Sequence, residues 1–393
     1  MGLTDAFLIA LAGTAFAVLM LPRLRASAIW RATVTPLASI IGSGFLVVAP
    51  LLADVAGPWA ALAMLGIVGL AWLIGAALRF NIRHAEQGLA GATLALQRLA
   101  NLALTGAYVI SVAFYIRLLA AFALSLGPPD SARNETLLAT AILLAIALVG
   151  WLRGLHGLEV LETVSVSLKL AIILALLAGL LLFDAGSGRW SGELAAAEMD
   201  PLTRARMLAG MLLVVQGFET ARYLGTAYPA PLRVRAMRLA QIGSGAIYVG
   251  FMLLVMPLLP SLPEGPPSET AIIALAGLVA PALPLMLILA AFMSQLSAAI
   301  ADTVGAGGLV EEETRARLRA RRAYPLLIAL AIALIWSFDL FQVIAIASRA
   351  CAFYYMAQAL IAARLSRNAL QRSGFLALAA GMALTAAFAL PVE

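Results

Sequence analysis

Residues 34–53 read VTPLASIIGSGFLVVAPLLA, an apolar run long enough to span a bilayer as a helix, with Gly42, Ser43 and Gly44 after Ile41 near its middle. Glycine adopts backbone dihedrals that other residues avoid, so this triplet predicts an interrupted helix. An interruption leaves free N–H groups at the positive end of the second half-helix, where they can bind a carboxylate. The alternative is that the glycines only permit close helix packing.

A second apolar run, 206–228, carries Gln216, Gly217, Phe218 and Glu219 near its middle, followed by Arg222. A break here would free backbone carbonyls, which suit an ammonium group, and Phe218 is placed to cover the site. Glu219 and Arg222 are ionisable residues in an apolar span, which are costly unless they face protein or water. Their spacing allows a structural ion pair, and a role in contacting a solute or proton is the open alternative.

The rest of the chain predicts an all-α polytopic membrane protein. It has 393 residues, 63% apolar and only 12% charged, which is too much apolar surface for a soluble domain of this length. About twelve runs read as transmembrane helices. They lie near 6–22, 34–53, 57–78, 102–126, 136–152, 161–183, 206–228, 239–260, 277–304, 324–338, 340–363 and 373–390.

The basic balance of the chain follows the predicted loops. Most loop arginines fall on one side of the membrane, and the exceptions are Arg133, Arg189, Arg204 and Arg206. This asymmetry is the positive-inside pattern and predicts both termini outside, in an inner (plasma) membrane of bacterial type. The pI of about 9.9 therefore reflects topology and predicts no nucleic-acid partner.

Two halves of similar length, 33–184 and 205–366, each contain five predicted spans and each open with a Gly-interrupted one. Because five is odd, the second half must be inverted relative to the first, and such paired interruptions indicate a transporter site. The expected organisation is an extra N-terminal helix and inner linker in 1–32, an outer loop in 185–204 and a C-terminal helix in 367–393.

Lys169 is the only lysine among 26 basic residues, and it lies mid-span in an apolar run. Lysine offers a compact head that titrates readily when desolvated, unlike arginine, so we expect Lys169 to occupy a cation site or to bind a transported proton. Asp302, by contrast, is expected near the inner surface, where it balances a basic loop.

Motifs for other chemistry are missing from the sequence. It contains no P-loop, dinucleotide-binding glycine fingerprint or nucleophile elbow. Cys351 is the only cysteine, and His84 and His156 have no metal-like spacing. We therefore expect neither an enzyme nor a bound cofactor or metal.

With these residues in view, the chain resembles the amino acid–polyamine–organocation (APC) superfamily of transporters over residues 33–366. In that superfamily the first core helix breaks at Gly-Ser-Gly, which this chain has at 42–44. The sixth core helix breaks at Gly-Phe-Glu, which this chain has at 217–219. Pro231 and Arg233 also match, whereas Thr226 and Ala227 replace the usual paired acids. Lys169 looks like the lysine that replaces a sodium ion in sodium-independent members.

The resemblance implies a sodium-independent secondary transporter, proton-coupled or an exchanger, that moves an amino acid or related small solute by alternating access. The expected solute-binding residues are Ile41, Gly42, Ser43, Gly44, Gln216, Gly217, Phe218, Glu219 and Arg222, with Lys169 and Glu219 in coupling. The alternatives are a permease for a polyamine, nucleobase or inorganic ion, and a non-transporting membrane sensor.

Overall fold

The structure is a computed structural model that describes residues 2–42, 44–84, 88–124, 132–153, 159–188, 199–225, 227–261 and 271–390. Throughout these ranges the regular elements are helices, with no strand among them. The first half contains α1 (Leu3–Leu19), α2 (Pro22–Arg25), α3 (Ala28–Ile40), α4 (Gly44–Ala56), η1 (Gly57–Trp59), α5 (Ala60–His84), α6 (Gly91–Leu124), α7 (Ala132–Arg153) and α8 (Glu159–Ser187).

The second half contains shorter pieces at its start. Its elements are α9 (Pro201–Gly210), η3 (Met211–Val215), η4 (Phe218–Leu224), α10 (Ala230–Val255), η5 (Met256–Ser261), α11 (Ala271–Val279), α12 (Leu283–Glu313), α13 (Ala320–Ser337), α14 (Leu340–Leu365) and α15 (Ala369–Phe388). The elements labelled η are 3₁₀-helices, which have three residues per turn and are normally short.

Within the described ranges, 7 helical segments are long and apolar enough to cross a membrane. They are Val47–His84, Gly91–Leu124, Arg133–Leu152, Glu162–Ser187, Ala230–Ser261, Leu283–Glu313 and Ala320–Ser337. Large apolar side chains such as Leu62, Leu73, Leu144, Leu148 and Leu285 are exposed, which suits a surface solvated by lipid. The chain is therefore an integral membrane protein, and the count of twelve spans and the inverted repeat stay predictions.

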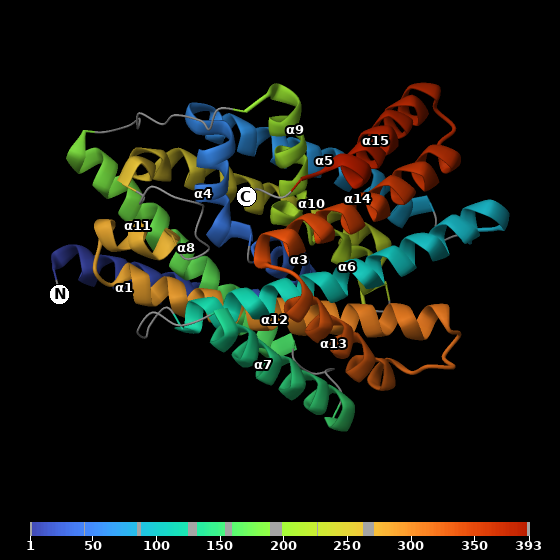
Figure 1. The fold of residues 1–393 in the computed structure, drawn as a ribbon, viewed down its shortest axis with the longest axis horizontal. Helices are drawn as coiled ribbons and strands as arrows, with labels where there is room; N and C mark the ends of the chain where they lie inside the picture. The colour runs from blue at the N-terminus through green and yellow to red at the C-terminus, as the bar shows by residue number, and fades with distance from the viewer. Residues whose placement is uncertain are drawn as a thin grey trace.

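Helix α6 is the central element of the bundle. It packs along α12 and α14 and also contacts α7 and α13, and Figure 1 shows α6 and α12 running beside each other across the molecule. Most of its middle turns are buried on every side, as expected for a helix that is apolar all round. Side chains of α6 therefore reach the interior rather than lipid.

Several helices extend beyond the apolar runs into polar sequence. The segments 79–101 and 305–323, which lie between predicted spans, are largely helical, because α5 continues to His84, α6 begins at Gly91 and α12 continues to Glu313. The predicted span 277–304 divides between α11 and α12. Hydropathy located the apolar part of these helices and missed their polar ends.

Local sequence explains where α9 starts. Asp200 is its N-cap and accepts hydrogen bonds from the backbone amides of Leu202 and Thr203, each 3.0 Å long, and Pro201 occupies the first helical position. Hydrogen bonds from Thr203 hold the pKa of the exposed Asp200 carboxyl below its usual value. This cap fixes the start of the segment that leads to the second break.

Candidate functional site

The first candidate element is the interruption between α3 and α4. Helix α3 ends at Ile40, Ile41 has the non-helical dihedrals φ −85° and ψ 60°, and α4 begins at Gly44. Ile41 and Gly42 are buried, and Ser43 lies outside the described residues. Backbone carbonyls at the end of α3 thus lack the amide partners that a continuing helix would supply.

Side chains from two other helices form hydrogen bonds with these carbonyls. Lys169 on α8 donates from Nζ to the Ala38 carbonyl at 2.6 Å and to the Ile41 carbonyl at 2.5 Å. Ser294 on α12 lies 3.3 Å from the same Nζ and donates to the Ile41 carbonyl at 3.2 Å. An ammonium group has three donors, so this oxygen cage uses all of them.

The burial of Lys169 explains why its amino group needs this cage of oxygen atoms. The residue is 1% exposed, so its head does not reach the membrane surface. A buried cation is stable only when polar groups replace its water, and here two carbonyls and one hydroxyl do so. Lys169 therefore places its amino group against the first break, and it ties α8 to α3 and α12.

The second candidate element is the interruption between η3 and η4. The chain changes direction at Gly217, whose φ of 114° is open to glycine and strained for other residues. A Cβ atom at Gly217 would lie 2.6 Å from the carbonyl carbon of Ser39, which leaves no room for a side chain. The glycine is thus required both by the turn and by the approach of α3.

The two interruptions face each other and pack reciprocally. Gly217 abuts Ser39, which precedes the first break, while a Cβ atom at Gly44 would lie 2.6 Å from the Cα of Val214, which precedes the second. Tyr248 on α10 places its hydroxyl 3.0 Å from the Ile40 carbonyl and 2.7 Å from the Val214 carbonyl. One phenol thereby joins the free carbonyls of both breaks.

Glu219 and Phe218 lie directly after the second break and are both buried. The Glu219 carboxylate accepts hydrogen bonds from the Gly217 amide at 2.9 Å and from the Tyr355 hydroxyl at 2.8 Å. The Phe218 ring stacks on Tyr355, with centroids 5.4 Å apart and an interplanar angle of 12°. Tyr355 on α14 thus holds both side chains against the bundle.

Arg222 lies one turn further and has partners of its own. Its guanidinium donates to the Gln97 side chain on α6 at 2.7 Å and to the side-chain oxygen of Gln358 on α14. Asn81 on α5 donates to the same Gln358 oxygen at 2.9 Å. Arg222 and Glu219 are therefore held in separate networks, which does not favour the ion pair that their spacing allows.

Gln216 lies between the breaks and α6. Its amide nitrogen donates to the Ser111 hydroxyl at 3.3 Å, while its Oε1 is buried and has no partner within the described chain. A hydrogen bond also links Ser111 to Tyr115, whose ring lies 3.8 Å from where a Cβ at Gly42 would be. Polar groups on α6 therefore face both interruptions.

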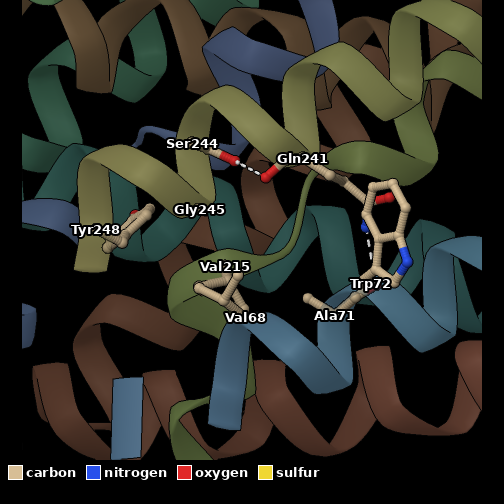
Figure 2. Close-up of a pocket in the computed structure, with 8 residues that line it drawn as sticks. All are labelled: Val68, Ala71, Trp72, Val215, Gln241, Ser244, Gly245 and Tyr248. Atoms are coloured by element: carbon tan, nitrogen blue, oxygen red, sulfur yellow. Dashed lines mark hydrogen bonds between the residues drawn. The ribbon is translucent and has the colours of Figure 1, made fainter. Parts of the chain in front are cut away.

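A small pocket borders the second break from the other side, between α5, α10 and η3 (Figure 2). Gln241 donates to the Ala71 carbonyl at 2.8 Å across it. The pocket reaches the break only through Val215 and Tyr248, and none of the residues predicted to bind solute lines it. Its lining is Val68, Ala71, Trp72, Val215, Gln241, Ser244, Gly245 and Tyr248.

Sequence reasoning found the two breaks and Lys169, and it missed their partners. Tyr248 and Tyr355 lie on α10 and α14, far from the breaks in sequence, and a Tyr in an apolar helix carries no signal of its own. Gln97 and Gln358 were equally hidden, although buried amides in a membrane helix need partners and so point to polar contacts.

Three comparisons with known proteins bear on this geometry. A family model for APC superfamily transporters matches residues 22–390. A protein of Aquifex aeolicus (strain VF5), described only as uncharacterized, is 45% identical over 363 residues, which cover 90% of this chain and 88% of the relative.

Solved structures share the fold at low identity. A mutant of the manganese transporter of Eremococcus coleocola has a TM-score of 0.58 at 14% identity, covering 92% of this chain and 87% of that one. A Na⁺-coupled sialic acid symporter in a substrate-bound outward-open state has a TM-score of 0.53 at 13% identity, covering 100% and 99%. The family model spans nearly the whole chain, and this protein belongs to the APC superfamily of membrane transporters.

Proposed function

We propose that this chain is a sodium-independent secondary transporter that moves an amino acid or a related small solute by alternating access. The observation that carries the proposal is the Lys169 cage, in which Nζ contacts the Ala38 and Ile41 carbonyls of the first break. A fixed ammonium at this point supplies the positive charge that a bound sodium ion would otherwise supply. The transporter then has no need of sodium there.

The solute is proposed to bind between the breaks. Its carboxylate would contact the backbone amides of Gly42, Ser43 and Gly44, at the positive end of α4. Its ammonium group would contact carbonyls around Gln216 and Gly217, and Phe218 would close over it. The nearness of the two interruptions supports this arrangement, because a solute bound beside them would contact both broken helices at once.

Lys169 also supports a coupling role. Its contacts join α8, α3 and α12, so loss of its charge would remove the link between these helices. A change that favours one conformation over another shifts the population of inward and outward states. We propose that the protonation of Lys169 biases these states, with Glu219 as the second coupling residue.

The membrane topology forms part of the proposal. The first half, 33–184, and the inverted second half, 205–366, would rock against each other about the breaks, with both termini outside a bacterial-type plasma membrane. Single cysteines placed at each terminus in a Cys351→Ser background would test this orientation. We expect a membrane-impermeant maleimide to label the cysteine at each terminus in intact cells. Protection of both cysteines from the reagent would contradict the outside orientation.

Uptake into proteoliposomes tests the central role of Lys169. We expect Lys169→Ala to lose sodium-free uptake and its pH dependence, while the exposed-site control Arg235→Ala retains both. The solute is first chosen by a thermal-shift screen of amino acids, polyamines, nucleobases and metal ions, since a ligand of the folded state raises its stability. Unchanged uptake and an unchanged pH profile in Lys169→Ala would remove Lys169 from the mechanism.

A further inference from the structure

Asp302 on α12 is a second acidic residue in the interior. It is 1% exposed, so it does not balance a basic loop at the surface as its sequence position predicts. Its Oδ1 is buried and has no hydrogen-bond partner among the residues that the structure describes. The proposed mechanism does not use this carboxyl group.

Titratable groups on three elements interact electrostatically with Asp302, and of these elements α6 packs along α12. The carboxyl group of Asp302 is close enough to interact electrostatically with four groups. They are Tyr108 and Tyr115 on α6, Glu219 on η4 and Cys351 on α14. Phenols and thiols are neutral near pH 7, so Glu219 is the charged neighbour in this set and it repels a second anion.

The buried cations nearby are engaged elsewhere. Lys169 on α8 donates to the Ala38 and Ile41 carbonyls, and Arg222 on η4 donates to Gln97 and Gln358. On α13, Tyr324 packs against Gly307, beyond Asp302 along α12. Within the described parts of the chain, Asp302 therefore has no cation of its own.

Other unpartnered polar atoms lie on the same side of α12. Gln295 is fully buried, and both its Oε1 and its Nε2 lack partners in the described structure. It precedes Asp302 by two helical turns, which places both residues on one face of the helix. The Oε1 atom of Gln216, at the second break, is also unpartnered in the described structure.

A buried carboxylate with no cation beside it is too costly to persist as a bare anion, so it binds either a proton or a cation. A metal ion fits poorly, since no group of three His, Cys, Asp or Glu side chains in the described ranges could hold one. The unpartnered amide and carboxyl oxygens are instead suited to accept hydrogen bonds from an ammonium or guanidinium group.

We propose that Asp302 binds a second positively charged group of the solute, in addition to the ammonium group that contacts carbonyls around Gln216 and Gly217, and that a proton occupies the same carboxyl group when the solute is absent. This inference rests on the proposed transport function and assigns it a cationic class of solute. The charge balances, since each bound cation releases one proton from Asp302 to water. Exchange of a proton for an organic cation at one carboxylate would couple their movements in opposite directions.

Calorimetry on the purified full chain tests the exchange. Arginine and putrescine serve as cationic probes, leucine as a neutral probe and glutamate as an anionic one, each titrated in two buffers with different ionisation enthalpies. We expect the cationic probes to bind with release of about one proton. Because protons compete for the carboxylate, their affinity should fall about tenfold for each unit by which the pH is lowered through the acidic range.

The variants separate a binding role from a structural one. Asp302→Asn is expected to bind the cationic probes at least tenfold more weakly, with no proton release and no pH dependence, while Asp302→Glu retains all three. The control is Asp54→Asn, which removes a carboxyl group on α4 about 15 Å along the helix from Gly44. Should Asp302→Asn fail to fold, the proton count of the wild type and of Asp302→Glu decides the question.

Three results would overturn the inference. They are tightest binding of leucine or glutamate, binding of cations without proton release, and an Asp302→Asn variant that behaves like the wild type. Transport of leucine by proteoliposomes would leave the proposed function standing while removing the role of Asp302. A chain that binds and transports none of the probes contradicts both.

Discussion

The hydroxyl oxygen of Tyr248 lies 2.7 Å from the carbonyl oxygen of Val214, the residue that precedes the turn at Gln216 and Gly217. The same hydroxyl lies 3.0 Å from the Ile40 carbonyl at the end of α3. A single side chain therefore partners the ends of both interrupted helices. Any motion that separates the two breaks must first disturb this contact.

Replacing Tyr248 by Phe should therefore destabilise both breaks. The change keeps the ring and removes the only donor shown for these two carbonyls, at a cost of about 1–3 kcal/mol for buried groups left unpaired. We expect a lower thermal midpoint in detergent and weaker solute binding. Tyr228→Phe, in the loop before α10, is the matched control, and equal midpoints for the two variants would contradict the bridging role.

Gly217 should tolerate no side chain. An alanine there would need a positive φ, which costs roughly 1–2 kcal/mol, and its Cβ would overlap Ser39. We expect Gly217→Ala to unfold at a lower temperature and to lose solute binding. Gly250→Ala on α10 is the control, because a Cβ there meets nothing within 4 Å. Normal binding and stability in Gly217→Ala would show that the turn is not needed.

Arg222 should hold η4 against α6 and α14 rather than contact the solute. Its planar guanidinium reaches two amide oxygens on different helices, a geometry that neither Lys nor Gln reproduces. We expect Arg222→Gln to increase hydrogen–deuterium exchange of the backbone amides in 218–225, while the exposed Arg235→Gln does not. Unchanged exchange together with lost solute binding would place Arg222 on the solute instead.

The fold class followed from composition because lipid imposes a simple rule. A chain that is 63% apolar with spans of about twenty residues must form helices, and the two glycine motifs marked where helices stop. The 3₁₀ geometry on both sides of Gly217 was not predictable, since it depends on the fit of η3 against α14 and α5 and of η4 against α3 and α10. The predicted spans also ended too early wherever a helix continues into polar sequence.

Single residues were predictable only when their chemistry was out of place. Lys169 stood out as a lone lysine in an apolar run, and the structure places it in an oxygen cage. Asp302 was equally out of place, yet its position close to the end of the predicted span 277–304 led to the wrong expectation of a surface role. Tyr248 and Gln358 gave no signal, because their importance comes from neighbours that are far away in sequence.

The account rests on a solute held by the backbones of two interrupted helices, and a solute-bound structure tests it most directly. We predict that cryo-electron microscopy of the complex will place the solute between 41–44 and 216–219, with a carboxylate, where it has one, on the amides of 42–44. Density for the solute in the pocket of Trp72 and Gln241, with both breaks unoccupied, would contradict the account.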